Sequence, residues 1–343
     1  MKGLKQTPPD KNETVLVHLA SGIGNIVFAT PLLIALSEMH LTIDVRLDAD
    51  YKQTAELLEG WSIVREIFCG TSRNLDSYDY ILPAIPPFYW PRFQHLYKTV
   101  RKNICRPLDS LFYENEQEYY LRFAYTLGYP LERSPYYCLP IAPSNRLEVK
   151  PTTLIIAPGC KTGEMALKRW PYFPELAERF DDVILLGTED DMRDAQGRVF
   201  QFAPHVRSYV GQLSLRESAE FMAGAEAVVG NDSGLCHIAG AVGTPTLVLF
   251  GPTPDKTLGH FPENVRVLRA GLPCEPCWFR KRFESCNRHI DCLHRLTIDQ
   301  VEAAVRSLLG QQKEDQKAAP ADERNGTPNR LELALCAIRS KAQ

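Results

Sequence analysis

One segment in the C-terminal half of the chain reads Ala227-Val228-Val229-Gly230-Asn231-Asp232-Ser233-Gly234-Leu235-Cys236-His237-Ile238-Ala239-Gly240-Ala241-Val242-Gly243-Thr244-Pro245-Thr246. Its apolar beginning predicts a strand, its small residues predict a helix, and Thr246 opens a second strand. Asp232 and Ser233 are preferred N-cap residues, and Gly234 allows close approach to the backbone. The unpaired amides of a helix start suit a phosphate. The segment therefore predicts a parallel βαβ unit with a phosphate or diphosphate site, and we expect His237 to face that site from the first helical turn.

The same alternation extends outward from this segment in both directions. We expect strands over residues 14–19, 41–47, 63–68 and 78–82 in the N-terminal half, and over 153–157, 183–186, 227–229 and 246–250 in the C-terminal half. We expect helices from the turn after Leu19 to about Met39, and over 54–58, 174–180, 215–224 and 235–242. Strands that alternate with helices pair in parallel, because a parallel connection needs a crossover. The sequence thus predicts two doubly wound α/β halves, which bind ligands at the carboxyl ends of their strands.

The rest of the chain is organised around these halves. We expect a disordered tail over residues 1–13, a first domain over 14–145, a second domain over 146–310, and a flexible tail over 311–343 with a candidate helix at 331–338. The boundary lies in a linker-like stretch, 142–151. Residues 86–137 interrupt the alternation with aromatic and basic side chains. These are either helices that pack their aromatic rings or an insertion that faces an anionic or sugar acceptor.

Composition and charge exclude several classes of protein. The chain has 343 residues, of which 44% are hydrophobic and 24% charged, so disorder throughout is excluded. Its formal net charge of −3 argues against a nucleic-acid-binding protein, which carries a basic excess. No apolar run approaches the roughly 20 residues that span a bilayer, and the N-terminus has no apolar core of the signal-peptide type. We therefore expect a cytoplasmic protein without a transmembrane segment.

Further motifs stand on both sides of the central segment. Upstream are Ala157-Pro158-Gly159-Cys160-Lys161-Thr162-Gly163 and Lys168-Arg169-Trp170-Pro171, and downstream is Leu249-Phe250-Gly251-Pro252-Thr253. With these motifs in this order, the chain resembles glycosyltransferase family 9, the ADP-heptose transferases of lipopolysaccharide core synthesis, over about residues 14–310. The resemblance implies the GT-B fold, in which two Rossmann-like domains face a central cleft. It also implies that the N-terminal domain takes the acceptor and the C-terminal domain takes the nucleotide sugar.

The resemblance also implies roles for individual residues. Lys168 corresponds to a lysine that contacts the nucleotide diphosphate and helps catalysis, the backbone of Leu213 to a position against the adenine, and Glu189 to an acid that holds the ribose. The remaining residues expected to bind the nucleotide sugar are Gly24, Thr162, Asp232, Ser233, Gly234, Leu235 and His237. Each has a plainer interpretation, in which Lys168 is a solvated surface lysine and Leu213 is ordinary core.

The expected reaction moves a sugar, with ADP-heptose as the donor that the resemblance implies, to a hydroxyl of a saccharide, protein or metabolite. Departure of the nucleotide builds negative charge on its diphosphate, which a helix start and Lys168 can stabilise without a catalytic metal. No Asp-x-Asp motif stands out, and the side chains of the adjacent pairs Asp181-Asp182 and Asp190-Asp191 diverge. We expect metal-independent, inverting transfer by direct displacement.

The first glycine turn departs from the family pattern. Members of the family carry Gly-Asp here, with the aspartate as general base, whereas this chain has Gly24-Asn25. A carboxamide cannot accept a proton at neutral pH. Either another group serves as base (His18, Asp44, Asp48 or an anionic acceptor), or Asn25 only orients a good nucleophile, or the protein binds nucleotide sugar without turnover. By itself, Asn25 is also an ordinary turn or cap residue.

Four of the ten cysteines are grouped as Cys274-x2-Cys277-x8-Cys286-x5-Cys292. Four thiolates at such spacing form a tetrahedral cage for structural zinc or iron, with no position open for catalysis. Many family 9 sequences have comparable cysteines, and some protein-modifying relatives bind iron through them. The alternatives are reduced free thiols or an adventitious disulfide.

Two other function classes remain for comparison. A non-catalytic nucleotide-sugar sensor or assembly partner would bind an ADP-sugar without releasing ADP. A dinucleotide-dependent oxidoreductase would use Gly22-Ile23-Gly24 after the first strand. Val27 stands where the third glycine of that motif belongs, which weakens the second class.

Overall fold

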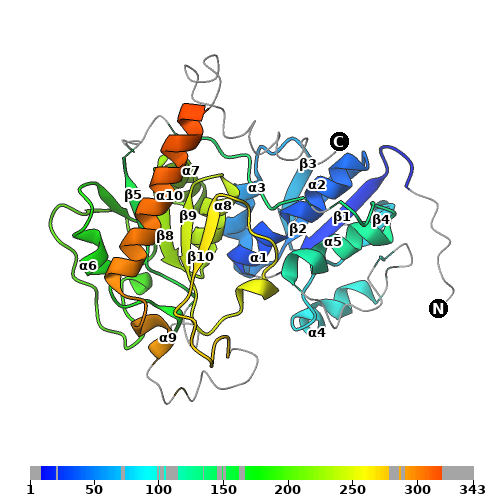
Figure 1. The fold of residues 1–343 in the computed structure, drawn as a ribbon. Coiled ribbons are helices and arrows are strands. Elements are labelled where there is room, and N and C mark those ends of the chain that lie inside the picture. Colours follow the sequence, from blue (N-terminus) through cyan, green and yellow to red (C-terminus); the bar gives the residue numbers. More distant parts are fainter. Residues whose placement is uncertain are drawn as a thin grey trace. The chain divides into compact units, whose positions relative to one another are not determined.

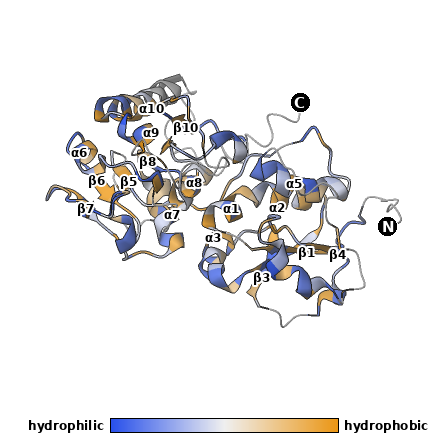
Figure 2. Ribbon diagram, turned by 90° about the horizontal axis from the view of Figure 1, so that it is seen from below, coloured by the Kyte–Doolittle hydropathy of each residue, from blue (hydrophilic) through white to orange (hydrophobic). Residues whose placement is uncertain are grey.

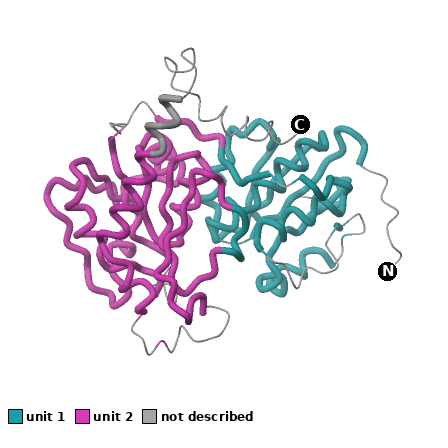
Figure 3. Tube along the Cα trace, viewed as in Figure 1, with its two compact units in different colours: residues 1–139, 256–260 teal, residues 140–255, 261–343 magenta. Residues whose placement is uncertain are grey.

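The structure is a computed structural model, and it divides the chain into two compact units (Figure 3). The first unit comprises Met1–Leu139 with Lys256–His260, and the second comprises Pro140–Asp255 with Phe261–Gln343. The structure describes residues 9–20, 22–70, 74–98, 100, 104–105, 115–133, 135–144, 149, 152–161, 167–277, 286 and 290–318. The expected boundaries of the two tails and the two domains stay predictions. The helix expected at 331–338 lies outside the described residues.

The N-terminal unit is built on a four-stranded parallel sheet with the order β3-β2-β1-β4 (Figure 1). Its strands are β1 (Thr14–Leu19), β2 (Thr42–Leu47), β3 (Val64–Cys69) and β4 (Tyr80–Leu82). Its helices are α1 (Ile23–Phe28), α2 (Thr30–Glu38), α3 (Ala55–Leu58), α4 (Trp90–Phe93) and α5 (Glu116–Thr126). The central strands β1 and β2 are almost wholly buried, as parallel strands covered on both faces must be.

The helix expected after the first glycine turn is two helices. The break falls at Ala29, and α2 begins at Thr30 with a proline in its first turn, where the missing N–H costs nothing. Thr30 and Pro31 thus open the second helix, a pair of residue types that favours a helix start.

The aromatic segment 86–137 packs many of its rings in its described part. Phe93 and Tyr97 join Leu16 and Ile81 in one apolar cluster on the sheet. The largest buried side chains of α5 are Tyr119, Tyr120 and Phe123. Phe88 is the exception, with 87% of its surface exposed. Packing therefore explains most of the aromatic residues in the described part of this segment.

The C-terminal unit has a six-stranded parallel sheet with the order β10-β9-β8-β5-β6-β7. Its strands are β5 (Leu154–Ala157), β6 (Val183–Leu185), β7 (Arg207–Ser208), β8 (Ala227–Asn231), β9 (Thr246–Leu249) and β10 (Val265–Leu268). Its helices are α6 (Phe173–Ala177), α7 (Leu215–Gly224), α8 (Gly234–Ala241), α9 (Asp291–His294) and α10 (Ile298–Ala318). The sequence did not predict β7 and β10, the two edge strands, because one is very short and the other only half-buried.

The core of this unit lies between the sheet and its outer helices. Leu154 and Ile156 of β5 share a cluster with Trp170, which is fully buried, and with Val301 and Val305 of α10. In Figure 2, β5 and β6 are hydrophobic, whereas α10 shows both hydrophilic and hydrophobic stretches, as an amphipathic surface helix does. Two doubly wound α/β domains are thus confirmed.

Helix α10 continues to Ala318, past Gln311, where the sequence predicts a linker. The charged residues after Gln311 do not prevent a helix, because a helix whose earlier turns are packed can continue without further apolar residues. No helix among the described residues combines the length and the apolar character that crossing a bilayer requires.

Candidate functional site

The carboxyl ends of β5 and β8 lie side by side, and Asn231 ties them together. Its Nδ2 donates to the carbonyl of Pro158 at 2.5 Å, in the turn after β5, and its Oδ1 accepts from the amide of Trp170 at 2.9 Å. Gly230 makes this approach possible, because a Cβ there would lie 2.3 Å from the carbonyl oxygen of Ala157. The Pro-Gly turn and the Lys-Arg-Trp-Pro segment are thereby held at the end of β8.

A buried charged cluster follows directly after Asn231. Lys168 Nζ lies 2.7 Å from Asp232 Oδ2, and His237 Nε2 lies 3.1 Å from Asp232 Oδ1. All three residues are at least nine-tenths buried. Burial opposes ionisation of Asp232, but Lys168 and His237 outweigh it and hold the pKa of Asp232 well below its usual range. The interpretation of Lys168 as a solvated surface lysine is therefore wrong.

The start of α8 completes this end of the sheet. Ser233 is the N-cap, in an extended conformation, and its side chain caps no helix amide. Gly234 and Leu235 form the first turn, and the buried His237 follows them. Their amides carry the positive end of the helix dipole. A helix start beside a lysine ammonium attracts a phosphate, although the carboxylate of Asp232 offsets part of that charge.

A second turn borders this region at the end of β6. Arg169, which is 4% exposed, lies 3.7 Å from Asp191 Oδ1 and donates to the carbonyl of Arg193 at 3.2 Å. Gly159 lies so close to Asp191 that an added Cβ would be 2.1 Å from its carboxyl group. The turns that follow β5 and β6 are therefore packed against each other.

The residues expected at the adenine and ribose lie on this same side of the sheet. Glu189 is exposed in the turn after β6, and Leu213 is half-buried in the loop before α7. The amide of Gly211 donates to the carbonyl of Gly187 at 2.9 Å, which joins the two loops. Leu213 is not ordinary core, and the structure brings its loop beside that of Glu189. Thr162 lies outside the described residues.

In the N-terminal unit, Gly24 and Asn25 belong to the short helix α1, at the carboxyl end of β1. The Nδ2 of Asn25 donates to Glu116 Oε2 at 2.6 Å. Glu116 is the first residue of α5, and the N-cap Asn115 accepts the amide of Glu118 at 2.7 Å. The position that carries an acid in the family is thus an amide in contact with an acid from another helix.

The three side chains considered from the sequence as alternative bases have other partners. His18 is 1% exposed and hydrogen-bonded to the Tyr97 hydroxyl, and burial, assisted by Arg46, lowers its pKa to about 3. Asp44 is fully buried and accepts two hydrogen bonds from Arg65, at 2.7 and 2.8 Å. Asp48 lies 3.6 Å from Arg92. Each of the three side chains is therefore engaged by another residue of the N-terminal unit.

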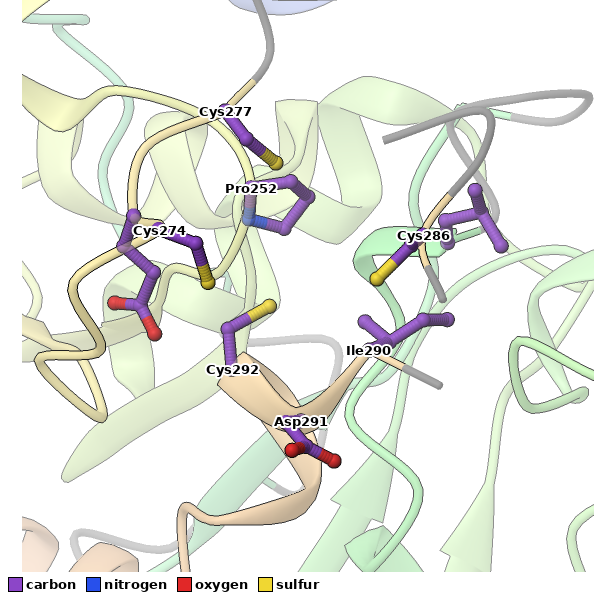
Figure 4. A pocket seen from close by; sticks show the side chains of 9 residues that line it. Pro252, Cys274, Cys277, Cys286, Ile290, Asp291 and Cys292 are labelled. Atoms are coloured by element: carbon purple, nitrogen blue, oxygen red, sulfur yellow. The ribbon is translucent and has the colours of Figure 1, made fainter. Parts of the chain in front are cut away.

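The four grouped cysteines line one pocket beside Pro252 (Figure 4). None of the four forms a disulfide within the described part of the chain. Burial, followed by the negative charge of Glu275, raises the pKa of Cys292 to about 12. Among the residues that the structure describes, no three His, Cys, Asp or Glu side chains are arranged to hold a metal ion. The pocket brings together the right donor atoms, but metal binding is not supported by their arrangement.

Two residues of these sites escaped the sequence argument. Asn231 stands inside the central segment, and an asparagine at a buried strand end was a signal that could have been used. Glu116 gave no such signal, since its partner Asn25 is 91 residues away in the chain.

Known proteins resemble this chain in both sequence and fold. Residues 117–287 match the profile of glycosyltransferase family 9 (heptosyltransferase). The lipopolysaccharide heptosyltransferase 1 of Pseudomonas aeruginosa is 32% identical over 159 residues, which are 41% of this chain and 44% of that protein. The chain therefore spans less than half the length of the curated relatives that it matches.

Two solved structures share the fold over most of the chain. The family 9 glycosyltransferase of Veillonella parvula has a TM-score of 0.71 at 17% identity and covers 89% of this chain and 100% of its own. The ADP-heptose lipopolysaccharide heptosyltransferase II of Escherichia coli has a TM-score of 0.63 at 21% identity, covering 88% and 99%. Motifs, family profile and fold agree, and the chain is a heptosyltransferase-like protein of glycosyltransferase family 9 with the GT-B fold.

Proposed function

We propose that this protein transfers a sugar from a nucleotide sugar, ADP-heptose, to an acceptor hydroxyl. The observation that carries the proposal is the start of α8, where Ser233 leaves the first helix amides without a side-chain cap and the buried Lys168 contacts Asp232, the residue before Ser233. That arrangement suits a diphosphate. A solved Escherichia coli heptosyltransferase of similar fold, WaaC, holds ADP-2-deoxy-2-fluoro heptose, which supports this donor class.

The proposed chemistry is a single displacement. The acceptor oxygen attacks the anomeric carbon, the bond from that carbon to the diphosphate oxygen breaks, and ADP leaves with the electron pair. Attack opposite the leaving group inverts the configuration. The α8 amides and Lys168 stabilise the charge that develops on the diphosphate, which is the part of the reaction that a prearranged site accelerates most. No step in this scheme requires a catalytic metal. We place the reaction in the cytoplasm.

Calorimetry with ADP and assay of ADP release from ADP-heptose test this function together. We expect one ADP site per chain, weaker binding of UDP and GDP, and release of ADP from ADP-heptose. Glu189→Gln should weaken ADP binding about 10- to 100-fold, because it removes a charged partner of the ribose hydroxyls. Glu178→Gln, an exposed residue after α6, is the control and should bind ADP normally. Absence of ADP binding to the wild-type protein would refute the assignment.

The alternative function is nucleotide-sugar binding without turnover, and the amide at Asn25 is the observation that favours it. A sensor of this kind binds ADP-heptose with normal affinity and releases no ADP. The same pair of measurements therefore separates the two functions.

We also propose a structural metal, zinc or iron, at Cys274, Cys277, Cys286 and Cys292. The proposal starts from the donor chemistry of these four residues, which line one pocket. Support comes from a solved structure of similar fold, the iron-containing Escherichia coli glycosyltransferase TibC. Thiolate ligation would require deprotonation of Cys292 against its raised pKa.

Metal analysis of protein purified without added metal should give about one equivalent, and Cys274→Ser/Cys277→Ser should remove it. Cys69→Ser, an exposed cysteine of the other unit, is the control. A metal content near zero in the wild-type protein would exclude the site.

A further inference from the structure

Two charged side chains on one face of β2 have opposite environments. Asp44 is fully buried, and Arg65 binds it at 2.7 and 2.8 Å, so its charge has a counter-ion. Arg46, two residues further along the strand, lies on the same face and is 5% exposed. Among the residues that the structure describes, Arg46 forms no ion pair, and its buried Nε has no hydrogen-bond partner. Because an arginine cannot lose its proton, this buried charge is uncompensated, which is costly.

His18 lies next to Arg46 on this face of the sheet. The two residues are paired in register on the adjacent strands β1 and β2 (Figure 1). The Nδ1 of His18 is hydrogen-bonded to the Tyr97 hydroxyl, whereas its Nε2 is buried and has no partner in the described part of the chain. Buried polar atoms are nearly always hydrogen-bonded. Two neighbouring side chains thus each present a buried nitrogen whose partner has to be explained.

Both nitrogens can donate to the same ligand. The Nε of Arg46 is always a donor. When the Tyr97 hydroxyl donates to Nδ1, the proton of the neutral His18 ring is on Nε2, which is then a donor as well. A water molecule accepts both hydrogen bonds but leaves the guanidinium charge uncompensated. A carboxylate or phosphate group supplies the acceptor oxygens and the negative charge together.

The position of the two side chains suits a ligand site. His18 and Arg46 are each the last residue but one of their strand, and parallel α/β domains bind ligands at the carboxyl ends of the strands. The ring of Phe93 covers His18 edge-on, with 5.3 Å between the ring centroids. Just beyond β2, Asp48 lies 3.6 Å from Arg92, whose side chain is 55% exposed. The protein surface is therefore reached within a few residues of Arg46.

We propose that Arg46 and His18 bind an oxyanion, the carboxylate or phosphate group of a ligand, at the carboxyl ends of β1 and β2. The guanidinium group supplies the positive charge and a donor, and Nε2 of His18 supplies a second, neutral donor. The oxyanion is either a free inorganic anion or the acid group of a sugar. The site lies wholly in the N-terminal unit and does not depend on the proposed nucleotide site.

Calorimetry on the full chain in a dilute Tris-chloride buffer tests the site with inorganic phosphate, glucose 6-phosphate and glucuronate. We expect at least one of these anions to bind and glucose, the neutral control, not to bind. Tighter binding of either sugar acid than of phosphate identifies a sugar ligand, whereas phosphate binding that is equal or tighter identifies a free anion. If the wild-type protein binds none of the three, the proposal is wrong.

The variant Arg46→Met keeps the apolar bulk of the side chain and removes its charge. It should weaken anion binding about 10- to 100-fold, because a charged hydrogen-bond donor is lost. Without an added oxyanion it should also raise Tm, because an uncompensated buried charge is replaced by an apolar group. Lys52→Met removes an exposed positive charge of the same unit and is the matched control, with Tm and anion binding as in the wild type.

The same variant separates this site from the start of α8, which also suits a phosphate. Anion binding that is unchanged in Arg46→Met would overturn the proposal and would leave the proposed function untouched. A structural role for Arg46 would appear as a lower Tm together with that unchanged binding.

A signal from His18 tests the site without altering Arg46. In protein with ¹⁵N-labelled histidine, the ring signals of His18 are assigned as those that disappear in His18→Gln. The anion that binds in calorimetry should shift the Nε2 signal and leave Nε2 as the protonated nitrogen of the ring. A His18 signal that does not respond to saturating anion, or a ring protonated on Nδ1 in the complex, would exclude His18 as a donor to the oxyanion.

Discussion

The C-terminal unit assembles Asp232, Ser233 and His237 from consecutive turns of one strand-helix junction, and only Lys168 comes from elsewhere in the chain. The N-terminal unit assembles Asn25 and Glu116 from two helices that are 91 residues apart. In the C-terminal unit, most residues of the candidate site lie in one segment of the chain, so a sequence motif predicts them. In the second case either residue alone looks like an ordinary helix-end residue. A contact between residues so far apart in the chain therefore has no signal in either local segment.

The largest expected effect sharpens this comparison in the C-terminal unit. Lys168→Met should destabilise the protein by about 3–5 kcal/mol in chemical denaturation, because it leaves the buried carboxylate of Asp232 without its cation. Lys161→Met, an exposed lysine of the same unit, is the control and should change stability by less than about 0.5 kcal/mol.

Removing both charges should reverse much of that loss. Lys168→Met/Asp232→Asn should recover more than half of the stability, since the unpaired charge rather than the missing contact carries most of the cost. If Lys168→Met alone lowered the free energy of unfolding by less than about 1 kcal/mol, solvent would have to reach the Lys168–Asp232 pair. The buried charged cluster of the C-terminal unit would then not differ from a surface ion pair.

The second prediction concerns pH and isolates the N-terminal unit. The folded state holds the pKa of His18 at about 3, against 6.5 for an ordinary histidine. The unfolded chain therefore binds a proton below pH 6.5 that the folded chain refuses, and stability falls as the pH falls. The slope is at most about 1.4 kcal/mol per pH unit, or about 2–3 kcal/mol between roughly pH 6.5 and 4.5.

Unfolding measured over that range should show a shallower slope for His18→Gln, whereas His95→Gln, at an exposed site, should keep the wild-type slope. Asp232 also loses its contribution to the free energy of unfolding as the pH falls, although the folded state favours its charged form, whereas it favours the neutral form of His18. Its pKa is lowered from 3.8, so its stabilisation is present above that value and is lost only at lower pH. An unchanged slope in His18→Gln would mean that His18 is protonated in the folded state.

The smallest effect compares a glycine from each unit. Gly230→Ala should cost about 1–3 kcal/mol and weaken ADP binding, because its Cβ would overlap the backbone oxygen of Ala157 and push β5 from β8. Gly22→Ser should stay within about 0.5 kcal/mol of the wild-type stability. A Cβ at Gly22 meets Asn25 Oδ1 only at 3.6 Å, and serine is a preferred N-cap at this position. Equal losses in the two variants would show that the strand-end packing of β8 is not special.

Much of the fold could be predicted from the sequence. Helix α7 was expected over the same residues, 215–224, that form it, and in the structure Ser214 and Glu217 make a capping box at its start. The buried strands β5, β6, β8 and β9 were recognised by their unbroken apolar runs. The edge strands β7 and β10 were missed, since a strand with one neighbour needs no such run.

The features of the candidate sites can also be separated into those that the sequence predicts and those that it does not. The sequence by itself determined the parallel βαβ order and the helix start at Asp232, because periodicity, caps and strand-end turns act between residues close in the chain. The tertiary structure alone decided that Lys168 is buried against Asp232, that His18 is kept neutral, and that Asn25 meets Glu116. Burial and charge pairing depend on which distant segments the fold brings together, and no local pattern encodes that proximity.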